Sequence, residues 1–98
     1  MKTYAGGRSL DGALVTVDGA ALPPRYDLRR LSATGFEWTY EGAGPAQLAL
    51  ALLADHFGDD ALALALYERF MHAVVAELDN SWELTSADID AALRGIIG

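Results

Sequence analysis

The spacing of apolar and polar positions changes near Pro45. Before it, short runs with a period of two predict strands, and after it Ala and Leu predominate and predict helices. Nearly every residue from Ala46 to Phe57 is apolar, so this helix should be apolar on most of its circumference and lie at the centre of the core. A glycine of the turn Gly42-Ala43-Gly44 suits its N-cap, Pro45 its first helical position and Gly58 its end.

A second helix is predicted from Asp60 to Leu78, and the carboxylates of Asp59 and Asp60 favour the positive end of its dipole. Its apolar residues recur at the spacing of one helical face: Ala63, Tyr67, Phe70, Met71, Val74 and Leu78. A short third helix should begin at Thr85 or Ser86, with Asp88 completing a capping box if Thr85 is the cap. Its apolar residues should dock it: Ile89, Leu93 and Ile96 or Ile97.

The first third of the chain predicts a small antiparallel meander. Lys2–Ala5 is expected to be a strand that Gly6 and Gly7 turn, because adjacent glycines readily adopt the positive φ of a tight reversal. Ala13–Val17 and Ala20–Leu22 are further strands, joined by the two-residue hairpin turn Asp18-Gly19.

Two less regular segments follow the meander. Arg25–Ala33 is a connector of mixed polarity. Gly35–Tyr40 alternates aromatic and polar residues, which predicts a strand with Phe36, Trp38 and Tyr40 on one buried side. A brief extended segment is also predicted at Trp82–Leu84. The whole pattern predicts an α+β fold, in which an antiparallel sheet of three to four short strands packs against two long helices and a short C-terminal helix.

Composition favours one globular domain, residues 1–98, since 52% of the residues are apolar and 21% are charged. The chain contains no cysteine, which excludes disulfides, thiolate zinc sites and cysteine nucleophiles and favours a reducing, cytoplasmic setting. The first residues lack an apolar signal segment, and the run Ala46–Ala54 is far shorter than the ~20 residues of a membrane span. We therefore expect neither secretion nor a membrane partner.

The net charge of −7 is unevenly distributed. Residues 1–35 hold five basic and three acidic side chains, whereas residues 36–98 hold two basic and eleven acidic ones. The acidic part would repel phosphate backbones and attract basic protein surfaces. Direct nucleic-acid binding is therefore not expected, with the segment Arg25–Arg30 as the one exception.

No catalytic, metal or cofactor signature is present. His56 and His72 are the only histidines, they lie too far apart for a shared metal site, and the zinc-protease spacing HExxH is absent. The serines occur in no GxSxG-like context. We therefore predict no enzyme activity, no catalytic residues, no metal and no cofactor.

Two features leave alternatives open. Arg25, Arg29 and Arg30 form the only basic cluster, which could hold an acidic partner or a phosphate but is better explained as neutralising the protein's own carboxylates. The joint between the aromatic segment and the first long helix could form a ligand groove, although core packing of the aromatics is the favoured explanation. The groove residues would be Trp38, Tyr40, Gly44 and Gln47.

The same joint carries a resemblance. It reads Gly35-Phe36-Glu37-Trp38-Thr39-Tyr40, then Gly42 and Gly44-Pro45-Ala46-Gln47-Leu48-Ala49. This run is similar to the GFEWxYxGxGPAQLA motif of an uncharacterised small domain family of bacteria, archaea and phages. Thr39, Glu41 and Ala43 stand where glycine or serine is more usual in that family. The resemblance implies no enzyme activity, and it implies a setting in which small phage domains bind host proteins, as anti-CRISPR proteins do.

Charge and resemblance together predict a non-enzymatic phage or mobile-element protein that binds a basic surface of a host nucleic-acid-processing protein complex, in its sharpest form as an anti-CRISPR inhibitor. The expected binding residues share an acidic helical face: Asp55, Asp59, Asp60, Glu68, Glu77 and Asp79. The alternatives are a small ligand-binding or enzymatic domain with its site at the joint, and a structural homo-oligomer. The sequence leaves open whether the protein is a monomer or a homodimer.

Overall fold

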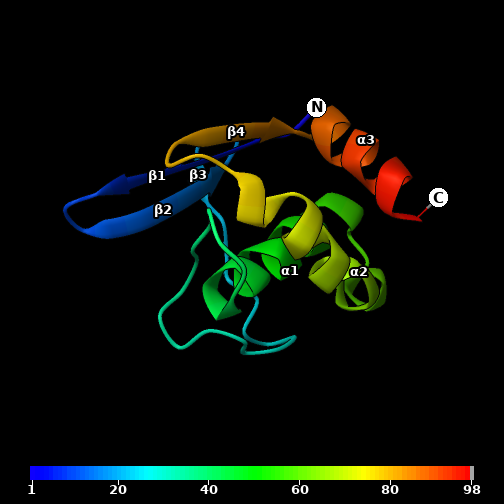
Figure 1. Ribbon diagram of the computed structural model, residues 1–98, viewed down its shortest axis with the longest axis horizontal. Coiled ribbons are helices and arrows are strands. Elements are labelled where there is room, and N and C mark those ends of the chain that lie inside the picture. Colours follow the sequence, from blue (N-terminus) through cyan, green and yellow to red (C-terminus); the bar gives the residue numbers. More distant parts are fainter. Residues whose placement is uncertain (98) are drawn as a thin grey trace.

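A computed structural model describes residues 1–97, and it shows an α+β fold. A four-stranded antiparallel sheet of order β3-β2-β1-β4 lies against the helices, and the β1–β2 hairpin projects beyond them (Figure 1). The elements in chain order are β1 Thr3–Ser9, β2 Gly12–Val17, β3 Ala20–Ala21, α1 Ala43–Phe57, α2 Asp60–Ala73, the 3₁₀ turn η1 Val75–Glu77, β4 Trp82–Thr85 and α3 Ser86–Ile97. Among these residues, no helix combines the length and the apolar character that crossing a bilayer requires.

The glycine pair near the N-terminus does not form the predicted turn. Gly6 and Gly7 lie inside β1, and the chain reverses after Ser9 instead. Gly6 pairs with Trp82 of β4, and a Cβ atom built on Gly6 would lie 2.4 Å from the indole ring of Trp82. Glycine is therefore needed at position 6 because the ring packs directly on the backbone, and not because the chain turns there.

The second predicted turn is confirmed. Asp18 has φ 49° and Gly19 has φ 86°, so both residues of the two-residue turn are left-handed, as a type I′ hairpin requires. In the preceding strand Val15 is buried and Leu14 is 61% exposed, which is the alternation of a sheet with one covered face.

Helix α1 is the centre of the core, as its composition predicts. Every residue from Gly44 to Ala54 is buried, and α2 packs along α1. Pro45 is the third residue of α1 and not, as predicted, the first, but its missing N–H is still one of the unpaired groups of the first turn. Gly58 ends α1 in the left-handed conformation.

The second long helix is shorter than predicted. It ends at Ala73, since Val74 leaves helical geometry and the chain continues as the 3₁₀ turn η1. The capping box at the third helix is confirmed: Asp88 N–H donates to Thr85 Oγ1 at 3.1 Å, and Thr85 N–H donates to Asp88 Oδ2 at 2.9 Å.

The predicted aromatic strand at Gly35–Tyr40 is wrong. Residues 22–42 form one irregular connector, hereafter the connector, which runs along the lower edge of the molecule (Figure 1). Trp38 is fully buried, whereas Tyr40 is 49% exposed, because Thr39 between them has φ 79° and breaks the extended backbone. Thr39 N–H donates to the carbonyl of Val75 in η1, so a distant segment sets this conformation.

Candidate functional site

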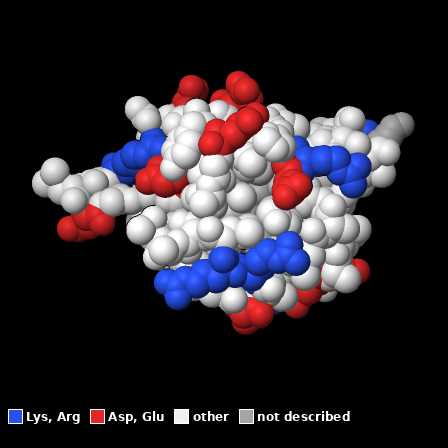
Figure 2. Space-filling view, turned by 60° about the horizontal axis from the view of Figure 1, so that its bottom comes forward, with Lys and Arg blue, Asp and Glu red and all other residues white. Residues whose placement is uncertain are grey.

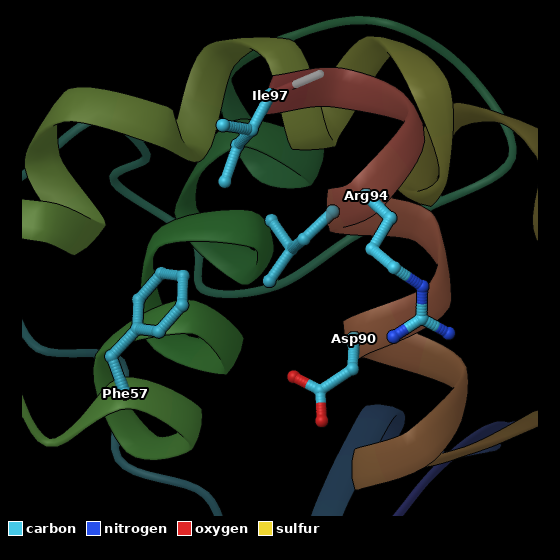
Figure 3. Close-up of a pocket in the computed structure, with 5 residues that line it drawn as sticks. Phe57, Asp90, Arg94 and Ile97 are labelled. Atoms are coloured by element: carbon cyan, nitrogen blue, oxygen red, sulfur yellow. The ribbon is translucent and has the colours of Figure 1, made fainter.

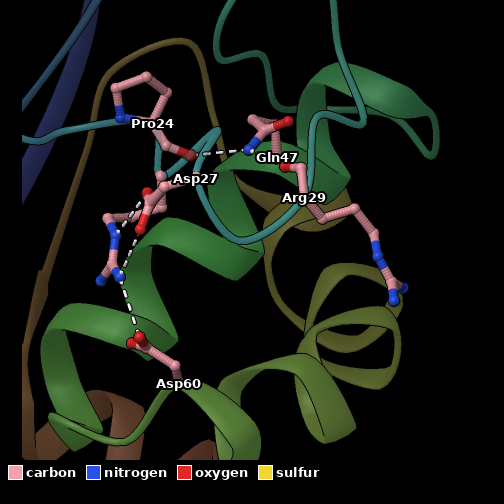
Figure 4. Close-up of polar contacts among 6 residues, drawn as sticks. Pro24, Asp27, Arg29, Gln47 and Asp60 are labelled. Atoms are coloured by element: carbon pink, nitrogen blue, oxygen red, sulfur yellow. Dashed lines mark hydrogen bonds and ion pairs between the residues drawn. The ribbon is translucent and has the colours of Figure 1, made fainter.

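The connector is held in place by one buried amide. Gln47 of α1 is fully buried, and its Nε2 donates to the carbonyls of Pro24 at 2.7 Å and Arg29 at 3.1 Å (Figure 4). Its Oε1 accepts from the backbone N–H groups of Leu31 at 2.7 Å and Ser32 at 3.1 Å. One side chain thus supplies four hydrogen bonds to a segment that forms no helix or strand of its own.

These bonds determine where the proposed groove residues lie. Gln47 directs its amide to the connector backbone, and Trp38 Nε1 donates to the carbonyl of Asn80 at 3.1 Å. Gly44 is buried, and a Cβ atom on it would lie 2.7 Å from Cβ of Glu37. Only Tyr40 of the four presents a substantial surface to solvent.

The three arginines of the connector fall into two groups. Arg25 is neutralised: its guanidinium donates to both carboxylate oxygens of Asp27 and to Asp60 Oδ2 of α2, each at 3.1 Å (Figure 4). These hydrogen bonds raise the pKa of Arg25, and the bond from Arg25 holds the pKa of Asp27 below its usual range. Arg29 and Arg30, in contrast, form no ion pair with a carboxylate of residues 1–97.

Three of the six predicted acidic binding residues have internal roles. Asp55 accepts hydrogen bonds from the Tyr4 hydroxyl at 2.7 Å and from Lys2 Nζ at 3.0 Å. Burial, followed by the hydrogen bond to Asp55, raises the pKa of Tyr4. Asp59 caps α2 by accepting from the N–H of Leu62, and Asp60 pairs with Arg25.

The other three acidic residues have no ion pair within residues 1–97. Glu68 in α2, Glu77 in η1 and Asp79 just after η1 are all exposed. Of the six predicted acidic binding residues, these three are the ones without an internal ion pair or cap, and they are hereafter called the acidic surface.

Each histidine is paired with a carboxylate from another part of the fold. His56 Nε2 of α1 lies 2.7 Å from Asp90 Oδ1 of α3, and His72 Nδ1 of α2 lies 2.9 Å from Glu41 Oε2 of the connector. Within residues 1–97 no three His, Cys, Asp or Glu side chains gather closely enough to hold a metal ion.

A cavity of about 430 Å³ lies between the end of α1 and α3. Phe57 faces Ile97 across it, and Asp90 and Arg94 stand on one side (Figure 3). The fifth lining residue, Leu93, shares with Ile97 the apolar spacing that predicts core docking of α3. The cavity could not be predicted from the sequence, because the residues that line a groove and those of a buried helix face have the same apolar spacing.

Comparison with known proteins gives a family but no activity. The model of the Family of unknown function (DUF6166) matches residues 4–95. The chain belongs to this family. No curated protein matches it, and no solved structure does. The DUF6166 match begins within β1 and ends within α3, so it includes the connector and the acidic surface.

For this DUF6166 domain, function must be argued from the chemistry of its side chains. The titratable groups that lie closest together, such as His56 with Asp90 and Tyr4 with Asp55, come from separate elements and hold those elements together. Several charged groups form no ion pair within residues 1–97, among them the acidic surface and the two connector arginines. Such groups can bind a partner electrostatically, since their charge is available to it.

Proposed function

We propose that this DUF6166 protein is a non-enzymatic binding protein whose acidic surface binds a basic surface of another protein. The observation that carries the proposal is that Glu68, Glu77 and Asp79 are exposed and unpaired within residues 1–97 of a chain of net charge −7. Exposed charges of one sign accelerate encounter with a surface of the opposite sign and disfavour partners of the same sign.

A host nucleic-acid-processing complex is the partner that fits this chemistry. Proteins that bind phosphate backbones present clustered Lys and Arg side chains, and an acidic domain can occupy such a surface in place of the nucleic acid. Such a protein would act in the cytoplasm of the host. The sharpest form of the proposal, an anti-CRISPR inhibitor, is supported by the small size and acidity of the chain and by its resemblance to a family that extends to phages.

Affinity capture from host lysate with the tagged protein tests the proposal. We expect a discrete protein partner at about 50 mM salt and its loss at about 500 mM, because salt screens exposed charges. The double variant Glu68→Lys/Glu77→Lys should weaken capture about tenfold or more. The control Asp11→Lys/Glu83→Lys changes the net charge equally at two other exposed carboxylates and should retain the partner. Capture that resists salt, or equal losses in both variants, would show that the acidic surface is not the binding site.

The ligand-site alternative at the aromatic joint has less support. Three of its four residues are buried and packed or hydrogen-bonded within the protein, namely Trp38, Gly44 and Gln47. A homo-oligomer retains some support from exposed apolar side chains, such as Leu14 on the sheet and Ile97 at the end of α3. Light scattering of the purified protein would separate a homo-oligomer from a monomeric binding protein.

A further inference from the structure

The connector is an unusually long irregular segment that the rest of the molecule holds in one shape. It occupies residues 22–42 without a helix or strand, whereas loops in compact domains beyond about 12–15 residues are uncommon and are usually functional or disordered. Gln47 fixes its backbone with four hydrogen bonds. Arg25 and Thr39 adopt left-handed conformations, with φ 58° and 79°, that cost free energy outside glycine. These bonds and the free-energy cost of the left-handed conformations indicate that the shape of the connector is functional.

Arg29 and Arg30 are positioned by tyrosines and not by carboxylates. Arg29 Nη1 donates to the Tyr67 hydroxyl at 3.3 Å, and the Arg29 carbonyl is fixed by Gln47. The guanidinium of Arg30 lies over the Tyr26 ring, 5.1 Å from its centroid. A guanidinium that stacks on a ring keeps its N–H groups free at its edge, in the fork geometry that matches a carboxylate. Both side chains are therefore oriented while their positive charge remains available.

We propose that Arg29 and Arg30 bind acidic side chains of a partner protein, as an interaction site opposite in charge to the acidic surface. Figure 2 shows Lys and Arg side chains gathered in a stripe across the face on which the connector lies. Arg25 belongs to the same segment, but Asp27 and Asp60 already occupy its fork. The two remaining forks can each accept one carboxylate in a bidentate pair.

A protein segment fits this site better than a nucleic acid does. Tight binding to a phosphate backbone uses several cationic contacts, about 6–10 in a typical protein–DNA complex, whereas the connector offers two unpaired guanidiniums. The net charge of −7 also repels a long polyanion, because its charges extend beyond the patch. A short acidic peptide places only a few charges against the patch and lies within a Debye length of it, about 8 Å at physiological salt.

Fluorescence anisotropy with a labelled six-residue oligoglutamate peptide tests the proposal at about 20 mM salt. We expect saturable binding that weakens about tenfold or more in Arg29→Gln/Arg30→Gln, since two charge-assisted contacts are lost. The matched control Arg69→Gln/Arg94→Gln removes the same charge from two arginines that also form no ion pair within residues 1–97, and it should bind within about twofold of wild type. The variant Arg30→Lys keeps the charge but loses the planar fork, and it should fall between these two.

Three results would overturn the proposal: no peptide binding at low salt, equal losses in the two double variants, or tighter binding of a single-stranded oligonucleotide than of the peptide. The last result would assign the site to nucleic acid. Circular dichroism of each variant confirms that the fold is retained. Because the peptide offers no basic group and every variant leaves Glu68, Glu77 and Asp79 unchanged, failure here is distinguishable from failure of the proposed function.

Discussion

A single glutamine sets the shape of the most irregular part of this molecule. Burying an amide costs free energy unless its donors and acceptor are paired, and the four hydrogen bonds of Gln47 meet that requirement. The same bonds pair backbone groups of the connector, which forms no strand or helix that would pair them internally. Gln47 therefore stabilises both the core of α1 and the face that displays Arg29 and Arg30.

Replacing this glutamine with an apolar side chain of similar length should be strongly destabilising. In Gln47→Met, four backbone groups lose their partner, and leaving a buried group unpaired costs about 1–3 kcal/mol. We expect the free energy of unfolding to fall by about 3–5 kcal/mol in urea titrations, with part of the loss offset as the connector rehydrates. The control Leu48→Met changes the next buried residue without breaking a hydrogen bond, and it should cost less than about 1.5 kcal/mol. Similar losses in both variants would refute the role assigned to Gln47.

At the level of elements, the two adjacent glycines of strand β1 have different structural roles. Both glycines pair with residues of β2, but only Gly6 lies beneath the Trp82 ring. The nearest atom to a Cβ built on Gly7 is Ser81 Oγ, at 4.0 Å. The two tryptophans meet edge to face, with ring centroids 5.8 Å apart, so the Trp82 ring cannot shift without disturbing Trp38.

Alanine substitutions at the two glycines should therefore change the free energy of unfolding by different amounts. Gly6→Ala forces its methyl group into the indole of Trp82 and should lower the free energy of unfolding by about 1–3 kcal/mol. Gly7→Ala meets no close neighbour and should be neutral or stabilising by up to about 1 kcal/mol, because alanine loses less backbone entropy on folding. Thermal unfolding of the pair measures the difference. Equal effects would show that the pair acts as a flexible unit, which is the turn-like role that the sequence predicted.

Most of the elements that the sequence predicted correctly are determined by near neighbours, although the predicted extended segment at Trp82 is also confirmed as β4 and pairs with the distant β1. The apolar run of α1, the Asp18-Gly19 turn and the Thr85–Asp88 capping box all depend on residues close in the chain. The Gly6-Gly7 turn and the aromatic strand were wrong because distant partners decide them: Trp82 packs on Gly6, and the carbonyl of Val75 binds Thr39.

Distant partners also determine which charged residues of the candidate surfaces are free. Whether each carboxylate or arginine is free could not be predicted from its position in the sequence. Arg25 is neutralised by Asp60, and Arg29 is oriented by Tyr67, both from a helix more than thirty residues further along the chain. The net acidity could be predicted, but its distribution between internal ion pairs and free charge depends on tertiary packing.

For the whole molecule, repulsion among unbalanced carboxylates lowers the free energy of unfolding. The chain carries a net charge of −7, and several of its carboxylates are balanced locally, as Asp55 is by Lys2 and Asp60 by Arg25. The acidic surface of Glu68, Glu77 and Asp79 is not balanced within residues 1–97, so it adds to the self-repulsion of the folded state. A surface kept for binding is expected to reduce stability in this way.

Neutralising the acidic surface should thus raise stability and weaken binding of the partner. In Glu68→Gln/Glu77→Gln/Asp79→Asn the free energy of unfolding should rise by about 0.5–1 kcal/mol at low ionic strength, because repulsion among carboxylates is removed. Urea titrations should show that this gain disappears near 1 M salt, where the Debye length is about 3 Å.

The same triple variant should lose the partner that the wild-type protein captures. The control Asp55→Asn weakens the contacts to Tyr4 and Lys2, so it should destabilise the fold, the opposite direction from the triple variant. If the triple variant is instead less stable than the wild type and still captures the partner, the three carboxylates support the fold and the binding surface lies elsewhere. A gain in stability together with a loss of capture would show that these charges are retained for recognition at the expense of the fold.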